Sequence, residues 1–163
     1  MAYLLEIEAF PIRINERGAW SHGGKSLHPR VELLFRKNIC VNEDGSYRIE
    51  LGPNKSALEV SDVAFFVQSI SIVRGSDGEV ESVQMTLSDG TVEALEPTTL
   101  MQSDDNVLYC RVLRDSFLVP CRFPTAAYHE LAFLMDFSLE EPTLQIGGTQ
   151  VSFGVYEKAP KGG

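Results

Sequence analysis

The sequence predicts an α+β protein built from two repeated strand-strand-helix-strand-strand units around mostly antiparallel sheets. One observation is a repeat at an offset of 98 residues: Ile12-Arg13-Ile14 matches Cys110-Arg111-Val112 (111 − 13 = 98), and Glu32-Leu33-Leu34-Phe35 matches Glu130-Leu131-Ala132-Phe133 (130 − 32 = 98). Another is that runs of alternating apolar and polar residues are separated by turns rich in glycine and aspartate. Repeated units bury apolar faces against each other, so we expect a concave ligand site where they meet.

The first unit begins with a predicted hairpin at residues 10–20, folded around the turn-forming Asn15-Glu16-Arg17-Gly18. Residues 29–39 predict a short helix, because Val31, Leu34, Phe35 and Ile39 fall on one face and proline suits a first turn. Strands are then predicted at 47–51 and 57–60.

The middle of the chain predicts a three-stranded meander, with strands at 64–73, 80–87 and 91–95. Residues 96–106 contain a proline and an acidic run, which is typical of an exposed connector. The second unit is predicted to contain a hairpin, a helix at 126–137 capped by Thr125, and two final strands. Its strands are expected at 108–113, 117–123, 143–146 and 150–156.

These elements divide into two domains. Residues 1–62 form the N-terminal repeat unit, and residues 63–163 contain the meander and the C-terminal repeat unit. A chain of 163 residues buries roughly 70% of its unfolded surface, so we expect the two parts to pack as one compact globule without a disulfide or metal.

Composition excludes several classes of function. The net charge of −9 repels polyphosphate, so DNA and RNA are not expected as partners. The three cysteines have unrelated spacings and no histidine cluster, which indicates buried thiols and neither a metal site nor a cofactor. No stretch is long and apolar enough to span a membrane and the first residues lack a signal-peptide pattern, so we expect a cytoplasmic protein.

The sequence carries no recognisable catalytic motif, and its candidate binding residues come from local chemistry. Trp20 offers a stacking face, while His22 and Lys25, around Gly23-Gly24, offer hydrogen-bond donors for a small anion or a base. The alternative is that Trp20 belongs to the core and the segment after it is only a bend.

Charged residues near the two hairpins suggest a second part of the site. Arg111 and Arg114 occupy places comparable to Arg13 and Arg17, and guanidinium groups in a cleft bind phosphate or carboxylate. Exposed arginines that offset an acidic surface are the alternative. Asp62 is expected either to cap a strand end or to pair with an arginine. The full predicted ligand site comprises Trp20, His22, Lys25, Asp62, Phe65, Arg111, Arg114 and Tyr128.

Several short motifs in fixed order resemble a bacterial family, domain-of-unknown-function family 1285. They are Gly18-Ala19-Trp20-Ser21-His22-Gly23-Gly24, Leu33-Leu34-Phe35, Glu43-Asp44-Gly45-Ser46-Tyr47, Glu59-Val60-Ser61-Asp62-Val63-Ala64-Phe65-Phe66 and Tyr128-His129-Glu130-Leu131. The resemblance covers roughly residues 10–137. It implies a duplicated α+β core, a second half similar to a pleckstrin-homology barrel, and a nucleotide-like ligand between the halves. Ala64 and Gly52 depart from the family, which usually has proline and threonine at these positions.

Together these features predict a non-enzymatic small-ligand-sensing or signal-transduction module. One alternative is a protein-interaction adaptor that uses an exposed strand edge or the acidic face from Glu79 to Glu96. The other is a hydrolase whose catalytic residues assemble only in the fold.

Overall fold

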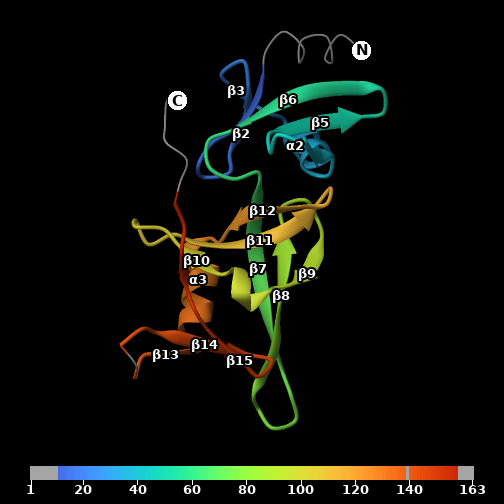
Figure 1. Ribbon diagram of the computed structural model, residues 1–163. Coiled ribbons are helices and arrows are strands. Elements are labelled where there is room, and N and C mark those ends of the chain that lie inside the picture. Colours follow the sequence, from blue (N-terminus) through green and yellow to red (C-terminus); the bar gives the residue numbers. More distant parts are fainter. Residues whose placement is uncertain (1–10, 139, 158–163) are drawn as a thin grey trace. The chain divides into compact units, whose positions relative to one another are not determined.

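The computed structural model describes residues 11–138 and 140–157 and is α+β, as predicted (Figure 1). Among these residues, strands form three sheets and two segments are α-helical. The chain divides into two compact units, one running to Phe65 and including Val112–Val119, the other comprising Phe66–Arg111 and the chain from Pro120 onward. The division lies close to the predicted boundary after residue 62, but the sequence did not indicate that residues 112–119 join the first unit.

The first unit contains a six-stranded sheet with the order β3-β2-β1-β6-β5-β4. Its pairs are antiparallel except for β1 and β6, which run parallel with Ile14 opposite Val60. The strands are β1 Ile12–Ile14, β2 Trp20–His22, β3 Lys25–Ser26, β4 Ile39–Val41, β5 Tyr47–Leu51 and β6 Asn54–Val60. The chain after His22 does not simply bend: Gly23 and Gly24 both have positive φ and form a tight turn that adds β3 as an edge strand.

The helix of this unit, α2, spans Pro29–Arg36 and is shorter than the predicted helix. His28 caps it, since its Nδ1 accepts a hydrogen bond from the Arg30 amide at 3.1 Å. Phe35 is buried as predicted, but Leu34 is 49% exposed and Ile39 lies in β4. The helix therefore presents to the core only the narrow face around Phe35.

Phe35 packs against Trp20 from β2, with their ring centroids 6.4 Å apart. Trp20 is 4% exposed and Phe35 is 1% exposed. These two aromatic side chains fill the space between the helix and the sheet of the first unit.

One edge of this sheet is covered by the turn of hairpin β11–β12, which belongs to the first unit. Asp115, at the tip, accepts a hydrogen bond from the Val41 amide of edge strand β4 through its Oδ2, at 2.7 Å. Asp115 and Ser116 both have positive φ, the conformation that a two-residue hairpin turn requires. The carboxylate thus satisfies an amide that an edge strand otherwise leaves unpaired.

The second unit is built on a seven-stranded sheet with the order β16-β10-β11-β12-β7-β8-β9 (Figure 1). This sheet curls into a half-barrel, which is compatible with the pleckstrin-homology-like barrel that the family resemblance implied. Its strands are β7 Phe65–Arg74, β8 Val80–Leu87, β9 Val92–Ala94, β10 Met101–Gln102, β11 Leu108–Arg114, β12 Phe117–Arg122 and β16 Gly154–Val155. The predicted three-stranded meander is confirmed as β7-β8-β9.

The segment predicted as an exposed connector is instead part of the sheet. It contains the 3-10 helix η1 Pro97–Thr99 and strand β10, and Leu100 is 1% exposed while Ser103 is 4% exposed. Pairing of β10 with both β11 and β16 holds this segment in place.

Helix α3 spans Thr125–Ala132 and ends five residues before the predicted end of the helix. Thr125 is not its cap: Pro124 occupies that position and offers no side-chain hydrogen bond. The chain turns at Phe133 into a small antiparallel sheet that consists of β13 Met135–Asp136, β14 Thr143–Ile146 and β15 Thr149–Ser152.

An order of strands, helix and strands repeats, but β4-β5-β6 and β13-β14-β15 follow the helices instead of the predicted two strands, and the helices are offset by 96 residues. Both helices have eight residues, and α3 starts 96 residues after α2 (125 − 29 = 96). At this offset Phe35 matches Leu131, and both side chains are buried. At an offset of 98 Leu131 instead matches Leu33, which is 48% exposed, so the sequence match was displaced by two residues here.

Cys110 and Cys121 are buried thiols, as predicted, and Cys110 Sγ lies 3.7 Å from Met85 Sδ. Cys40 is only partly buried, because it lies on edge strand β4. Burial raises the pKa of its thiol, which favours the unreactive protonated form. Within residues 11–138 and 140–157, no helix is long and apolar enough to cross a membrane.

Candidate ligand pocket

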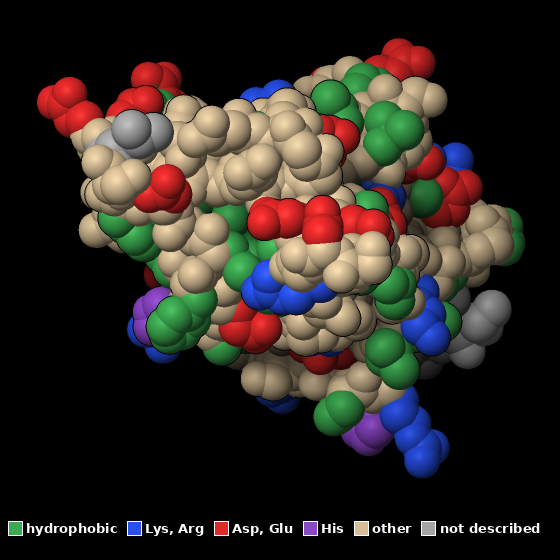
Figure 2. Space-filling model, turned by 90° about the horizontal axis from the view of Figure 1, so that it is seen from below, with side chains coloured by type: hydrophobic (Ala, Val, Ile, Leu, Met, Phe, Trp, Pro, Cys, Tyr) green, Lys and Arg blue, Asp and Glu red, His purple; other side chains and the backbone are tan. Residues whose placement is uncertain are grey.

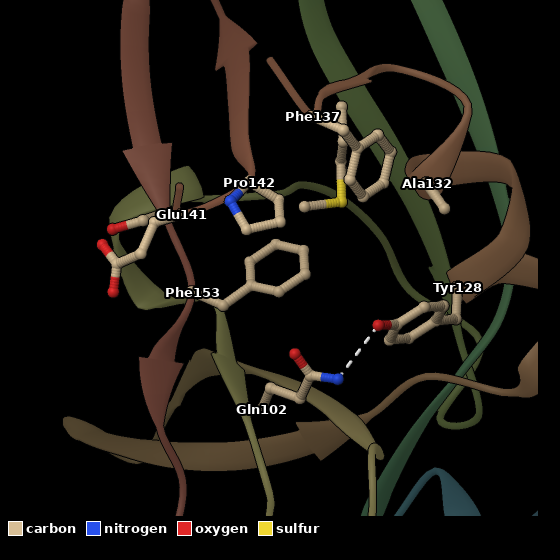
Figure 3. Close-up of a pocket in the computed structure, with 9 residues that line it drawn as sticks. Gln102, Tyr128, Ala132, Phe137, Glu141, Pro142 and Phe153 are labelled. Carbon is tan, nitrogen blue, oxygen red and sulfur yellow. Dashed lines mark hydrogen bonds between the residues drawn. The ribbon is translucent and has the colours of Figure 1, made fainter. Parts of the chain in front are cut away.

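A pocket of about 270 Å³ lies within the second unit, beside the end of α3 (Figure 3). Four parts of the chain line it: β10, the last turns of α3, the segment from β13 to Pro142, and the end of β15. Its lining residues are Gln102, Tyr128, Ala132, Met135, Phe137, Glu141, Pro142, Ser152 and Phe153.

The local structure explains how these side chains converge. Tyr128 and Ala132 are four residues apart in α3 and therefore share one face of the helix. Met135 lies in β13 and Phe137 directly follows this strand, and both side chains line the pocket. Because Ala132 has only a methyl group, the helix leaves space that its neighbours do not fill.

The walls of the pocket are apolar and partly aromatic. In Figure 3 the rings of Phe137, Phe153 and Pro142 surround the hollow. Met135 also lines it. Phe137 is 64% exposed although it is a large apolar residue. Such surfaces gain free energy when a flat apolar ligand covers them.

The polar groups of the pocket are few and ordered. Gln102 Nε2 donates to the Tyr128 hydroxyl at 3.0 Å and to Asn106 Oδ1 at 3.2 Å. Glu141 lies at the rim, with its carboxylate pointing away from the hollow in Figure 3. An apolar cavity with a small number of fixed polar groups is typical of a small-molecule site.

The electrostatics disfavour an anionic ligand. None of the nine residues that line the pocket is a lysine or arginine, and Glu141 is acidic. Hydrogen bonds from Ser138 hold the pKa of nearby Asp136 below its usual range, so this carboxylate is ionised at neutral pH. Acidic side chains are also spread over the face drawn in Figure 2. None of the residues that line this pocket offers a phosphate a cationic partner.

A second hollow of the same unit is larger and mostly polar. It has a volume of about 340 Å³ and is lined in part by Arg74, Glu79, Asp136 and Gln150. Gln150 Nε2 already donates to Thr143 Oγ1 at 3.0 Å. Phe133 is the one aromatic residue that lines it, against three in the first pocket, which makes it the weaker candidate. No group of three metal-binding side chains occurs in the part of the chain that the structure describes.

The predicted site residues of the first unit have different environments. Trp20 belongs to the core, the alternative that the sequence left open, and offers no exposed stacking face. Phe65 is 0% exposed, and the guanidinium carbon of Arg114 lies 5.1 Å from the centre of its ring. His22 and Lys25 lie opposite each other in the β2–β3 pair. Of the predicted site residues in this unit, the structure therefore brings Arg114 close to Phe65 and places His22 opposite Lys25.

Asp62 lies just beyond β6 in the first unit and is partly buried. Arg111 and Tyr128 belong to the second unit. The Arg111 side chain is exposed, while its backbone amide donates to Thr99 Oγ1 at 3.2 Å. Tyr128 alone of the eight residues lines the described pocket. That all eight share one site stays a prediction.

Sequence reasoning missed most of this pocket, including Gln102, Met135, Phe137 and Phe153. Gln102 was overlooked because its segment was interpreted as an exposed connector. The adjacent apolar pair Leu100-Met101 was the one signal that a strand was present. Phe137 was assigned to a helix that ends earlier, so its orientation was not foreseeable.

Two solved structures resemble this chain. A DUF1285 family protein from Silicibacter pomeroyi DSS-3 has a TM-score of 0.69 at 14% sequence identity, over 88% of this chain and 79% of its own. A DUF1285 family protein from Shewanella baltica OS155 has a TM-score of 0.58 at 20% identity, over 77% of this chain and 93% of its own.

The fold is that of DUF1285 proteins. The resemblance predicted from the short motifs is thus confirmed at the level of the fold. No protein-family model and no curated protein sequence matches the chain. The DUF1285 fold brings no established activity with it, so the function has to be argued from the site.

Proposed function

We propose that this protein is a small-ligand-sensing module with a role in signal transduction, and that it binds its ligand in the pocket beside α3. The observation that carries the proposal is the pocket itself, with aromatic walls and one ordered polar pair, Gln102 and Tyr128. Of a nucleotide-like ligand, we propose that the pocket binds only the base ring, since no lysine or arginine lines the pocket to hold a phosphate.

The size of the pocket supports a small ligand. Sites for drug-sized molecules have volumes of roughly 300–1,000 Å³, and this pocket has about 270 Å³. Covering about 100 Å² of apolar surface contributes roughly 2.5 kcal/mol. Together with the polar pair, this favours a weak, reversible complex of the kind that suits a sensor.

A substitution that fills the pocket tests the proposal. We expect Ala132→Met to fold normally, because methionine is a good helix former, while its side chain occupies the hollow. Ala126→Met is the matched control, since Ala126 is an exposed residue of the same helix that does not line the pocket.

The measurement is a thermal-shift and NMR screen with small uncharged heterocycles. A ligand at a hundred times its dissociation constant stabilises the wild type and Ala126→Met by about 2.7 kcal/mol, and Ala132→Met by much less. If no heterocycle stabilises the wild type, or if Ala132→Met responds as strongly as the control, the pocket is not the site.

The second candidate function is a protein-interaction adaptor. One observation favours it: the tip of hairpin β11–β12 exposes Leu113, Phe117 and Leu118, which are 60%, 36% and 58% exposed. Apolar side chains grouped in this way are typical of a protein-binding surface. Failure of every heterocycle in the screen would favour this function.

A further inference from the structure

We infer that the pocket recognises a flat, uncharged ring with adjacent N–H and C=O groups, that is, a cyclic amide, and that Asn106 positions Gln102 for this recognition. The inference rests on the proposed function and names the ligand class of the same site. Three groups carry it: the Gln102 side-chain amide, the Tyr128 hydroxyl and the Asn106 side chain.

The Gln102 amide presents an acceptor to the pocket. Both of its N–H bonds are used, one toward the Tyr128 hydroxyl at 3.0 Å and one toward Asn106 Oδ1 at 3.2 Å. An amide oxygen accepts two hydrogen bonds. In Figure 3 the oxygen of Gln102 points to the side of the Phe153 ring, where a bound ligand reaches it.

The Tyr128 hydroxyl presents a donor beside that acceptor. Its oxygen accepts the hydrogen bond from Gln102, so its own hydrogen remains available for a ligand. The Tyr128 hydroxyl lies 3.0 Å from Gln102 Nε2, and the acceptor oxygen belongs to the same amide group, so donor and acceptor are part of one polar edge. The pocket therefore has a polar edge of fixed pattern, one O–H and one C=O.

The complement of this edge is a ligand with a C=O next to an N–H. A carboxylate lacks the donor and is repelled by Glu141, and an ammonium group lacks the acceptor. The rings of Phe153, Phe137 and Pro142 require the rest of the ligand to be apolar and flat. A cyclic amide in a six-membered ring meets all of these conditions.

Asn106 determines which end of the Gln102 amide faces the pocket. Its backbone has φ of 64°, and its amide nitrogen donates to the Ser103 carbonyl at 3.0 Å, so the residue is held in a tight turn. From there Oδ1 accepts from Gln102 Nε2. Asn106 does not line the pocket. It acts through Gln102, as a positioning residue.

The test uses 2-pyridone as the probe, titrated into the whole protein and followed by NMR. Its N-methyl derivative has the same ring without the N–H donor, and we expect it to bind about tenfold more weakly. In Gln102→Met we expect the two compounds to bind with about equal affinity, so that the ratio of their dissociation constants falls from about ten to about one. Methionine keeps the volume of the side chain and removes the acceptor. Tyr128→Phe is expected to weaken the binding of 2-pyridone by a similar factor, because it removes the hydroxyl donor.

Two variants of Asn106 separate positioning from folding. Aspartate and glycine both tolerate positive φ, so both variants are expected to fold. A carboxylate only accepts hydrogen bonds, so Asn106→Asp keeps Gln102 oriented and keeps the tenfold ratio. Asn106→Gly removes the acceptor that orients the Gln102 side-chain amide, and we expect the ratio between the two dissociation constants to fall severalfold.

Uridine and uridine monophosphate distinguish the sources of the ring. If uridine binds and the monophosphate binds more weakly, the ligand is a nucleoside. If 2-pyridone binds and uridine does not, the ligand is a smaller free lactam. Either outcome supports recognition of a cyclic amide. If the N-methyl ring binds as tightly as 2-pyridone, or if the monophosphate binds best, the inference is wrong although the pocket still binds rings. If no ring binds, the proposed function fails as well.

Discussion

The two copies of the repeat share their order of elements but close in different ways. In the first copy, β6 pairs directly with β1, so that a single six-stranded sheet results. In the second copy, β13, β14 and β15 form a sheet of their own, and the following strand β16 pairs with β10. Among residues 11–138 and 140–157, strand β10 has no counterpart in the first copy, and it supplies Gln102 to the pocket.

The same face of the two helices shows what this difference does. At the offset of 96 residues, Tyr128 and Ala132 correspond to Glu32 and Arg36 (128 − 32 = 96; 132 − 36 = 96). Glu32 and Arg36 form an ion pair at 3.1 Å on the corresponding face of α2. Tyr128 and Ala132 line the pocket instead. The corresponding positions thus hold an ion pair in α2 and line a pocket in α3.

The largest expected effect concerns the aromatic core of the first copy. Phe35→Ala removes a buried aromatic ring that packs on Trp20, and we expect it to lower the free energy of unfolding by about 3–5 kcal/mol. Phe137→Ala in the second copy is the contrast, with an expected change within about 0.5 kcal/mol because Phe137 is 64% exposed. Urea denaturation followed by circular dichroism measures both, and equal losses would contradict the comparison.

An intermediate effect is expected at the equivalent turns β5–β6 and β14–β15. Gly52 and Gly147 have nearly the same φ, 58° and 59°, so alanine is strained at either position. A Cβ at Gly52 meets nothing within 4 Å, whereas one at Gly147 lies 3.0 Å from the Glu81 carbonyl oxygen. We expect Gly52→Ala to cost about 1 kcal/mol and Gly147→Ala roughly 2 kcal/mol. The comparison of their denaturation midpoints is decisive, and a larger loss for Gly52→Ala would show that backbone crowding at Gly147 is unimportant.

The smallest effect is expected at the ion pair of α2. Glu32→Gln removes a pair whose side chains are 26% and 23% exposed, and we expect a loss of about 0.5 kcal/mol. Addition of 1 M salt is expected to lower the free energy of unfolding of the wild type by a similar amount and to leave that of Glu32→Gln nearly unchanged. A salt response that is the same in both proteins would mean that the pair contributes nothing.

Sequence patterns predicted most strands, because alternation and turn residues are local signals. They predicted the helices but not their ends: α3 stops at Ala132 because the chain pairs with β14 from Met135 onward, and such pairing is not local. The role of His28 as a helix cap was also missed, since histidine is not a usual cap residue. Of the pocket, the sequence identified only Tyr128.

The sequence by itself determined the α+β class, the duplicated order of elements and the likeness to family 1285, since these depend on periodicity, glycine turns and short motifs. Only the tertiary structure decided that the second copy carries the described pocket. That outcome depends on strand β10, which is defined by its partners β11 and β16, and on the small side chain of Ala132 facing residues from distant strands. A hollow is the space that several segments leave unfilled, and no single segment encodes it.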